Sequence, residues 1–166
     1  MLWSTKDKYT LEPFNTEKEL EESIIVVQDE LFGKDRVYLD SKKVIGKKGY
    51  VRNIPDGYLI DLTSPKEPIL FVVENELTRH DHLKHIAVQI LEFSLSYETT
   101  PLKLKEIIKN ALKNNPSGSK KCAAYAKKNG YENVDYLLEA IINRKDSFKA
   151  LLIIDDMSDT LETVLT

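Results

Sequence analysis

The chain has 166 residues, of which 42% are hydrophobic and 31% charged, a balance typical of one compact globular domain. No apolar run approaches the roughly 18 residues of a membrane helix, and the first residues lack the apolar core of a secretory signal, so an intracellular, cytoplasmic protein without membrane contact is expected. Cys122 is the only cysteine, which excludes an internal disulfide and favours a small packed residue over a nucleophile.

Charge is distributed unevenly along the chain. The net charge is −3, yet the segment from Pro101 to Gly130 contains eight lysines and one acid, Glu106. That segment therefore carries +7 and the remainder −10. The asymmetry predicts a basic face next to an acidic site, although a solvated helix surface would have the same composition.

The first predicted element is a helix. Thr16 and Glu19 have the spacing of a capping box, in which two side chains satisfy free backbone N–H groups at a helix start. Apolar residues then recur at helical spacing, and Gly33 is placed to end the helix. The recurring residues are Leu20, Ile24, Val27 and Leu31.

Strands and helices alternate over the rest of the chain. Strands are predicted at 36–39, 57–61 and 69–73, and the unbroken apolar character of the third indicates burial on both faces. A helix at 81–97, two helices split at 114–118, a helix at 134–142, a second buried-type strand at 148–154 and a helix at 159–165 follow. This order predicts one α/β domain over 1–166, with a central sheet flanked by helices. The last helix has no stop signal, which is compatible with further domains C-terminal to this chain.

Three acidic residues are the chemical feature of the sequence. Glu74 and Glu76 follow five apolar residues, and residues i and i+2 of a strand point to the same face. Two carboxylates held side by side raise each other's pKa unless a cation compensates them, and their hard oxygen atoms favour Mg²⁺ or Mn²⁺. Asp56 precedes the neighbouring strand and adds a third carboxylate. A surface pair matched by Lys or Arg is the alternative interpretation of Glu74 and Glu76.

Pro55-Asp56, followed by Glu74-Asn75-Glu76, resembles the PD-x(n)-(D/E)-x-K signature of the restriction-endonuclease-like nuclease superfamily, in its E-x-E variant. The resemblance covers about 16–93, with 148–154 as the last core strand. It implies an αβββαβ core with a mixed sheet and a helical insertion at about 101–145. It also implies a metal-dependent endonuclease that hydrolyses phosphodiester bonds, with DNA preferred to RNA.

The resemblance also assigns roles to residues. Asp56 and Glu74 would hold the Mg²⁺ or Mn²⁺ ion, and an acid of the first helix would join them. Glu21 is our choice for that acid, with Glu17 and Glu22 as alternatives. Glu76 replaces the family's lysine and would ligate a second metal or accept the proton of the attacking water.

A second element resembles the Q-x-x-x-Y sequence of RecB-like nucleases, with Phe93 in place of tyrosine. It makes Gln89 a candidate catalytic residue, one turn from His85 on the same helix face; two solvent-facing polar residues are the alternative. Candidate nucleic-acid contacts are Lys47, Lys48, Arg79, His85, Lys120 and Lys121. A zinc site at His80, Asp81, His82 and His85 is disfavoured, because the first and third of these residues face different ways on a helix and no cysteine lies near.

Two further expectations stay open. A module with the same fold could keep DNA or protein binding without catalysis, since fold does not fix function, and the missing lysine favours that alternative. Homodimers are common among restriction enzymes, but no residue of this sequence demonstrates one.

Overall fold

The computed structural model describes residues 2–3, 8–9, 12–46, 53–78, 83–144 and 148–156, with the backbone alone for 2–3, 8–9 and 83–86. Within these ranges the chain has a mixed α/β fold with six helices and a four-stranded sheet. Two short strands near the start, β1 (Leu2–Trp3) and β2 (Lys8–Tyr9), form a separate antiparallel pair. No helix of the described part is both long and apolar enough to cross a membrane.

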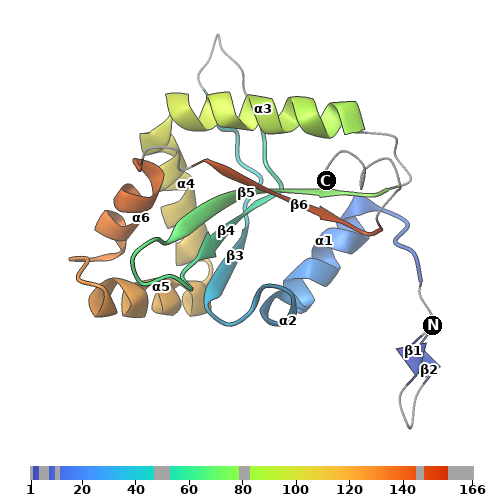
Figure 1. Cartoon of the computed structure of the whole chain (residues 1–166), viewed down its shortest axis with the longest axis horizontal. Coiled ribbons are helices and arrows are strands. Elements are labelled where there is room, and N and C mark those ends of the chain that lie inside the picture. Colours follow the sequence, from blue (N-terminus) through green and yellow to red (C-terminus); the bar gives the residue numbers. More distant parts are fainter. Residues whose placement is uncertain are drawn as a thin grey trace.

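The sheet has the strand order β3-β4-β5-β6 (Figure 1). Strands β3 (Arg36–Asp40), β4 (Gly57–Asp61) and β5 (Ile69–Glu76) are antiparallel neighbours along the chain. The last strand, β6 (Lys149–Ile154), pairs parallel with β5, with Glu74 opposite Leu152. The four helices between β5 and β6 provide the long crossover that a parallel pair requires.

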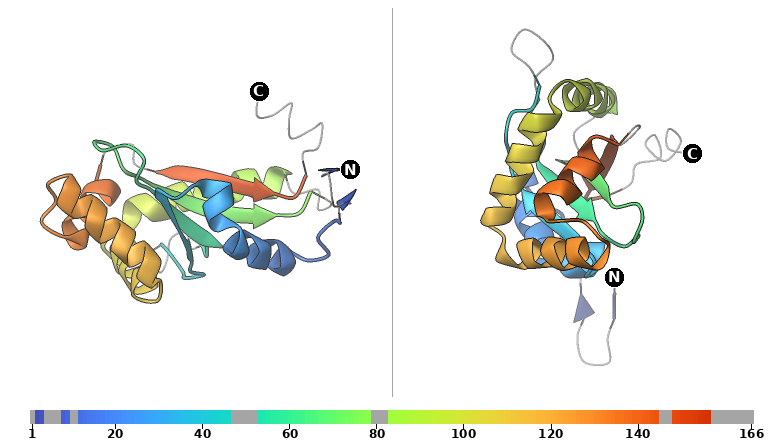
Figure 2. Two further views of the ribbon diagram at one scale, coloured as in Figure 1. Left: turned by 90° about the horizontal axis from the view of Figure 1, so that it is seen from below. Right: turned by 90° about the vertical axis from the view of Figure 1, so that its left-hand side faces the viewer.

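Helices cover both faces of the sheet (Figure 2). One face packs against α3 (Leu83–Thr99), α4 (Pro101–Lys113), α5 (Pro116–Lys128) and α6 (Val134–Ile142), of which the last three gather at one end of the sheet. The other face packs against α1 (Glu17–Val26) and α2 (Gln28–Phe32). Alternate side chains of β5 serve the two cores, since Leu70 and Val72 belong to the first and Val73 to the second.

The predicted N-terminal helix is present, but it is broken. The hydroxyl of Thr16 accepts a hydrogen bond from the Glu19 N–H at 3.2 Å, which confirms the predicted cap. The structure then divides the predicted single helix into α1 and α2 at Val27. Four β-branched residues occupy 24–27, and their restricted rotamers weaken a helix at that point. Gly33 therefore ends α2 rather than one long helix, with φ at 85°.

The predicted helical insertion is confirmed closely. The break between α4 and α5 lies at Asn114 and Asn115, and the Asn115 side chain accepts a hydrogen bond from the Gly118 N–H at 2.9 Å. Helix α5 then lies directly on β3. A Cβ atom added to Gly118 would stand 2.4 Å from the Val37 side chain, so this contact requires glycine.

Two strand predictions need correction. Strand β5 extends to Glu76, so Glu74 and Glu76 lie inside the strand rather than beyond it. Strand β6 is not buried on both faces as its apolar sequence suggested, because it is an edge of the sheet and Ala150–Ile154 stay partly exposed. An apolar run of residues shows that a strand is hydrophobic, but it does not show how many strands lie beside it in the sheet. The predicted helix at 159–165 lies outside the described residues.

Candidate functional site

The acidic residues meet where β4 begins and β5 ends. The Asp56 N–H donates to the Val73 carbonyl at 3.1 Å, which continues the β4–β5 pairing by one residue. The Asp56 carboxylate in turn accepts a hydrogen bond from the Asn75 N–H at 2.9 Å. Asp56 is therefore fixed against the two residues that flank Glu74, as the sequence predicted from the neighbouring strands.

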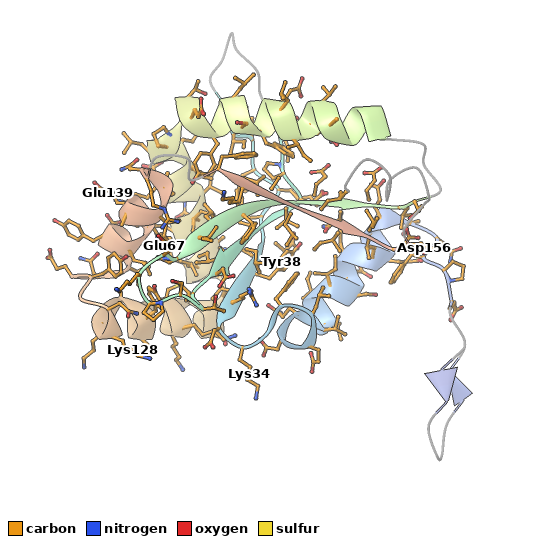
Figure 3. All side chains as sticks on the ribbon, viewed as in Figure 1. Lys34, Tyr38, Glu67, Lys128, Glu139 and Asp156 are labelled. Carbon is orange, nitrogen blue, oxygen red and sulfur yellow. The ribbon has the colours of Figure 1, made fainter. Side chains whose placement is uncertain are left out.

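Gly57 allows β3 to approach this position closely. A Cβ atom at Gly57 would stand 2.9 Å from the Leu39 carbonyl oxygen and 2.9 Å from the Tyr38 hydroxyl. The Tyr38 ring therefore occupies the space beside the start of β4, near the centre of the molecule (Figure 3). Burial raises the pKa of the Tyr38 phenol, and the negative charges of Asp40, Asp56 and Glu21 raise it further, while Asn75 opposes them.

Glu74 is a strongly perturbed carboxyl group. It is 8% exposed, and its Oε2 atom has no hydrogen-bond partner. Burial raises its pKa from 4.5 to about 8, with further contributions from the charges of Asp56 and Glu76. A hydrogen bond with Gln89 opposes this rise but does not cancel it. The fold thus keeps a carboxyl group where its ionised form is unfavourable.

Glu76 is also buried and lies on the same side of β5 as Glu74. Gln89 projects from α3, whose Phe93 packs into the larger core one turn away. The structure therefore brings together Asp56, Glu74, Glu76 and Gln89, which are the four residues that the sequence singled out for catalysis.

Lys42 is a site residue that the sequence analysis missed. Its ammonium lies 2.6 Å from a Glu21 oxygen and 3.0 Å from Asp56 Oδ1. Burial lowers the pKa of Lys42, but the hydrogen bonds and charges of the two carboxylates outweigh burial and raise that pKa above its ordinary value. The register of β3 against β4 places Lys42 at the site. Asp40 pairs with Gly57, so the residues just after Asp40 lie opposite those just before Gly57. That register is not apparent from a single sequence.

Among the acids of the first helix, Glu21 is the one that shares a partner with Asp56. Glu22 pairs with Lys18 at 3.7 Å, and its side chain is 64% exposed. The charge of Glu17 raises the pKa of Glu74. Glu21 is therefore the first-helix acid linked to Asp56 through Lys42, and Glu17 is the one whose charge acts on Glu74.

Of the predicted nucleic-acid contacts, Lys120 and Lys121 are the two whose side chains lie in the described part of the chain. Lys120 is exposed on α5, whereas Lys121 bonds Asp29 at 3.1 Å and the Arg36 carbonyl at 3.3 Å, which ties α5 to α2 and β3. His85 lies in α3 within the part described by its backbone alone. Lys47, Lys48, Arg79, His80, Asp81 and His82 lie outside the described residues.

Part of the lysine-rich segment is neutralised within the fold. Lys105 pairs with Asp135 at 2.6 Å and with Glu139 at 2.8 Å, and Lys109 pairs with Asp135 as well. These contacts join α4 to α6, so the two lysines hold the insertion together. Cys122 is fully buried, as predicted, and burial raises the pKa of its thiol to about 12.

The carboxylate oxygens of the site are the type of ligand that a hard divalent cation prefers. Buried carboxylates of like charge need a positive partner, and Glu74 Oε2 is a free oxygen ligand. In the described part of the chain no three acidic, histidine or cysteine side chains converge in a metal-binding arrangement. The Lys42 ammonium instead lies between Glu21 and Asp56 and compensates the negative charge of these two carboxylates.

Comparisons of the chain with protein-family models, with curated proteins and with solved structures found no match.

Proposed function

We propose that this chain is a metal-dependent nuclease that hydrolyses phosphodiester bonds in DNA. The observation that carries the proposal is Glu74, a buried carboxyl group with a free oxygen and a pKa near 8, crowded by Asp56 and Glu76. Such a group lowers the stability of the fold, and strongly perturbed groups of this kind concentrate at functional sites. A bound cation would relieve the crowding.

The arrangement of elements supports the same proposal. In chain order, helices α1 and α2 precede the three antiparallel strands, α3 follows, and β6 joins the sheet parallel to β5 after the α4–α6 insertion. This order agrees with the αβββαβ core that the resemblance of Pro55-Asp56 and Glu74-Asn75-Glu76 implies.

In this proposal Asp56 and Glu74 hold Mg²⁺ or Mn²⁺, and Glu21 is available on the opposite side of Lys42. When bound, such an ion lowers the pKa of its water and neutralises charge on the scissile phosphate. Gln89 keeps the Glu74 side chain in place through its hydrogen bond. Glu76 serves as a further ligand or as the acceptor of a proton.

Lys42 supplies the positive charge that the signature normally places at Glu76. Its side chain is 45% exposed, so its ammonium can reach a substrate phosphate while it stays beside Asp56. An ammonium at this position would stabilise the negative charge that develops in the transition state. The function of the missing lysine is thus assigned to a residue of the segment after β3.

The test is cleavage of single- and double-stranded DNA with Mg²⁺ or Mn²⁺ by the whole chain. We expect Glu74→Gln and Asp56→Asn to lose cleavage at least 100-fold, and Lys42→Met to lose it on a similar scale. Glu67→Gln and Lys34→Met are matched controls, because both residues are exposed and lie away from Tyr38 (Figure 3). Cleavage that is unchanged in the site variants would refute the assignment.

A second candidate is a catalytically inactive binding module. The ion pairs of Lys42 with Glu21 and Asp56 favour it, because they neutralise part of the site without a metal. Thermal unfolding with Mn²⁺ distinguishes the two, since a ligand that binds the folded state raises the melting temperature. An unchanged melting temperature together with no cleavage of any substrate would favour the inactive module.

A further inference from the structure

A groove lies beside the candidate site, along the outer edge of the sheet. It has a volume of about 1030 Å³ and lies between α1 on one side and α4 on the other, over β3 and the segment that follows it. Lys42 is part of its lining, so the groove is continuous with the group that contacts Asp56. Edge strand β3 forms its floor.

Besides Lys42, which pairs with Glu21 and Asp56, the groove is lined by two further lysines, Lys43 and Lys103. Lys43 follows β3 and Lys103 belongs to α4, so they stand on two different walls. Both are exposed, and neither forms an ion pair with a described residue. Other lysines of the insertion differ, because Lys105 and Lys109 are matched by acids of α6. Asp40 is the one acid among the lining residues.

The rest of the lining is suited to nucleobases rather than to phosphate alone. The amides of Gln28, Asn110 and Asn114 can each donate and accept hydrogen bonds. Ile25 and Ile107 add apolar surface between them. A duplex turns its stacked bases inward and would leave this surface unused, whereas the unpaired bases of a single strand can contact it.

A peptide strand added to the edge of β3 fits the structure less well. The Asn115 side chain already donates to the Tyr38 carbonyl at 3.2 Å. Lys121 donates to the Arg36 carbonyl at 3.3 Å. Two acceptors of β3 are therefore occupied, and pairing by a further strand would have to displace both.

We propose that this groove binds a single-stranded stretch of nucleic acid, with Lys43 and Lys103 on the phosphates and the amide and apolar residues against the bases, and leads it to Asp56 and Glu74. The inference rests on the proposed nuclease function for the identity of the site at its end. It goes further by naming an unpaired strand as the substrate and the α1–α4 groove as its path.

The test is the binding of a fluorescein-labelled oligo(dT) strand to the whole chain, followed by fluorescence anisotropy in EDTA so that no cleavage occurs. We expect the double variant Lys43→Glu/Lys103→Glu to weaken binding at least 10-fold. Two lost phosphate contacts should also reduce the slope of log affinity against log salt by about 1.4. The matched control is Lys128→Glu/Lys127→Glu, which makes the same change of charge at the far end of α5 (Figure 3).

Each outcome bears on one claim. Equal weakening by the groove and control variants, no binding by the wild type, or tighter binding of the duplex form of the same strand would overturn the groove proposal. Cleavage of DNA that is unaffected by the groove variants would also overturn it while the proposed nuclease function stands. Groove-dependent binding of the single strand without cleavage of any substrate would support the groove and refute the nuclease. A synthetic peptide that displaces the strand would point to the edge of β3 instead.

Discussion

Replacing Glu74 by glutamine should make the metal-free protein more stable at alkaline pH. The pKa of this carboxyl stands at about 8 in the folded chain, against an ordinary value of 4.5. The folded state therefore binds the proton more tightly than the unfolded state does. The contribution of Glu74 to stability is complete below pH 4.5, declines as the pH rises, and is fully lost above pH 8.

The size of the effect follows from the shift. At about 1.36 kcal/mol per pH unit, the full shift corresponds to roughly 5 kcal/mol. We expect about 2–4 kcal/mol, because Asp56 and Glu76 contribute to this shift and their side chains can move away from an ionised Glu74. Glutamine has nearly the same shape as glutamate and carries no charge to desolvate. The stability of Glu74→Gln should therefore not fall as the pH rises.

The measurement is urea unfolding in EDTA at pH 5 and at pH 8.5. Glu74→Gln should match the wild type within about 1 kcal/mol at pH 5 and exceed it by about 2–4 kcal/mol at pH 8.5. The exposed Glu67→Gln variant should show no such dependence on pH. Added Mn²⁺ should stabilise the wild type and not Glu74→Gln. A variant that is less stable than the wild type at both pH values would show that Glu74 is not strained, and the reasoning about the site would fail.

Three further predictions concern the packing of the helices and strands. Gly118→Ala should lower the free energy of unfolding by about 1–3 kcal/mol, because its new methyl group would stand 2.4 Å from the Val37 side chain; thermal unfolding would detect this, and an unchanged stability would contradict the close contact. Arg36→Ala should cost about 1–3 kcal/mol at pH 7, because Arg36 bonds Asp61 at 2.8 Å and the carbonyl that closes α2. Burial raises the pKa of Asp61, but bonds from Thr63 and Arg36 lower it below 3.8, so this cost should shrink as the pH falls through that range. Cys122 should react with a thiol reagent only at the rate of local or global unfolding, since the thiol is fully buried and its pKa is about 12; rapid labelling of the native chain would contradict this packing.

The local sequence pattern was sufficient to predict most of the secondary structure. The break between α4 and α5 follows from Asn115, which caps α5, and from Pro116 at its first position, where a missing N–H has no cost. The division of the first helix at Val27 was not predicted, because a helical repeat of apolar residues hides the cumulative weakness of four β-branched ones. The partial exposure of β6 was not predicted either, since position in a sheet is decided by the other strands.

The positions of the three acidic residues of the site were also predictable from the local sequence pattern. Glu74 and Glu76 share a side of β5 because strand geometry dictates it, and Asp56 is adjacent because β4 and β5 are antiparallel neighbours. Lys42 was not predictable, since it reaches Asp56 only through the register of β3 against β4. The lysines of the insertion look equivalent in sequence, yet acids of α6 neutralise Lys105 and Lys109.

The sequence by itself determined most of the helical and extended segments and which carboxylates stand together, because each depends on chemistry within a few residues. Only the tertiary structure decided that Glu74 is buried with a free oxygen, that Lys42 joins Glu21 to Asp56, and that Lys43 and Lys103 lie across a groove from each other. These features depend on burial and on contacts between distant segments. A pattern of residue types does not contain them, since burial and charge pairing arise only when the sheet and its helices are assembled.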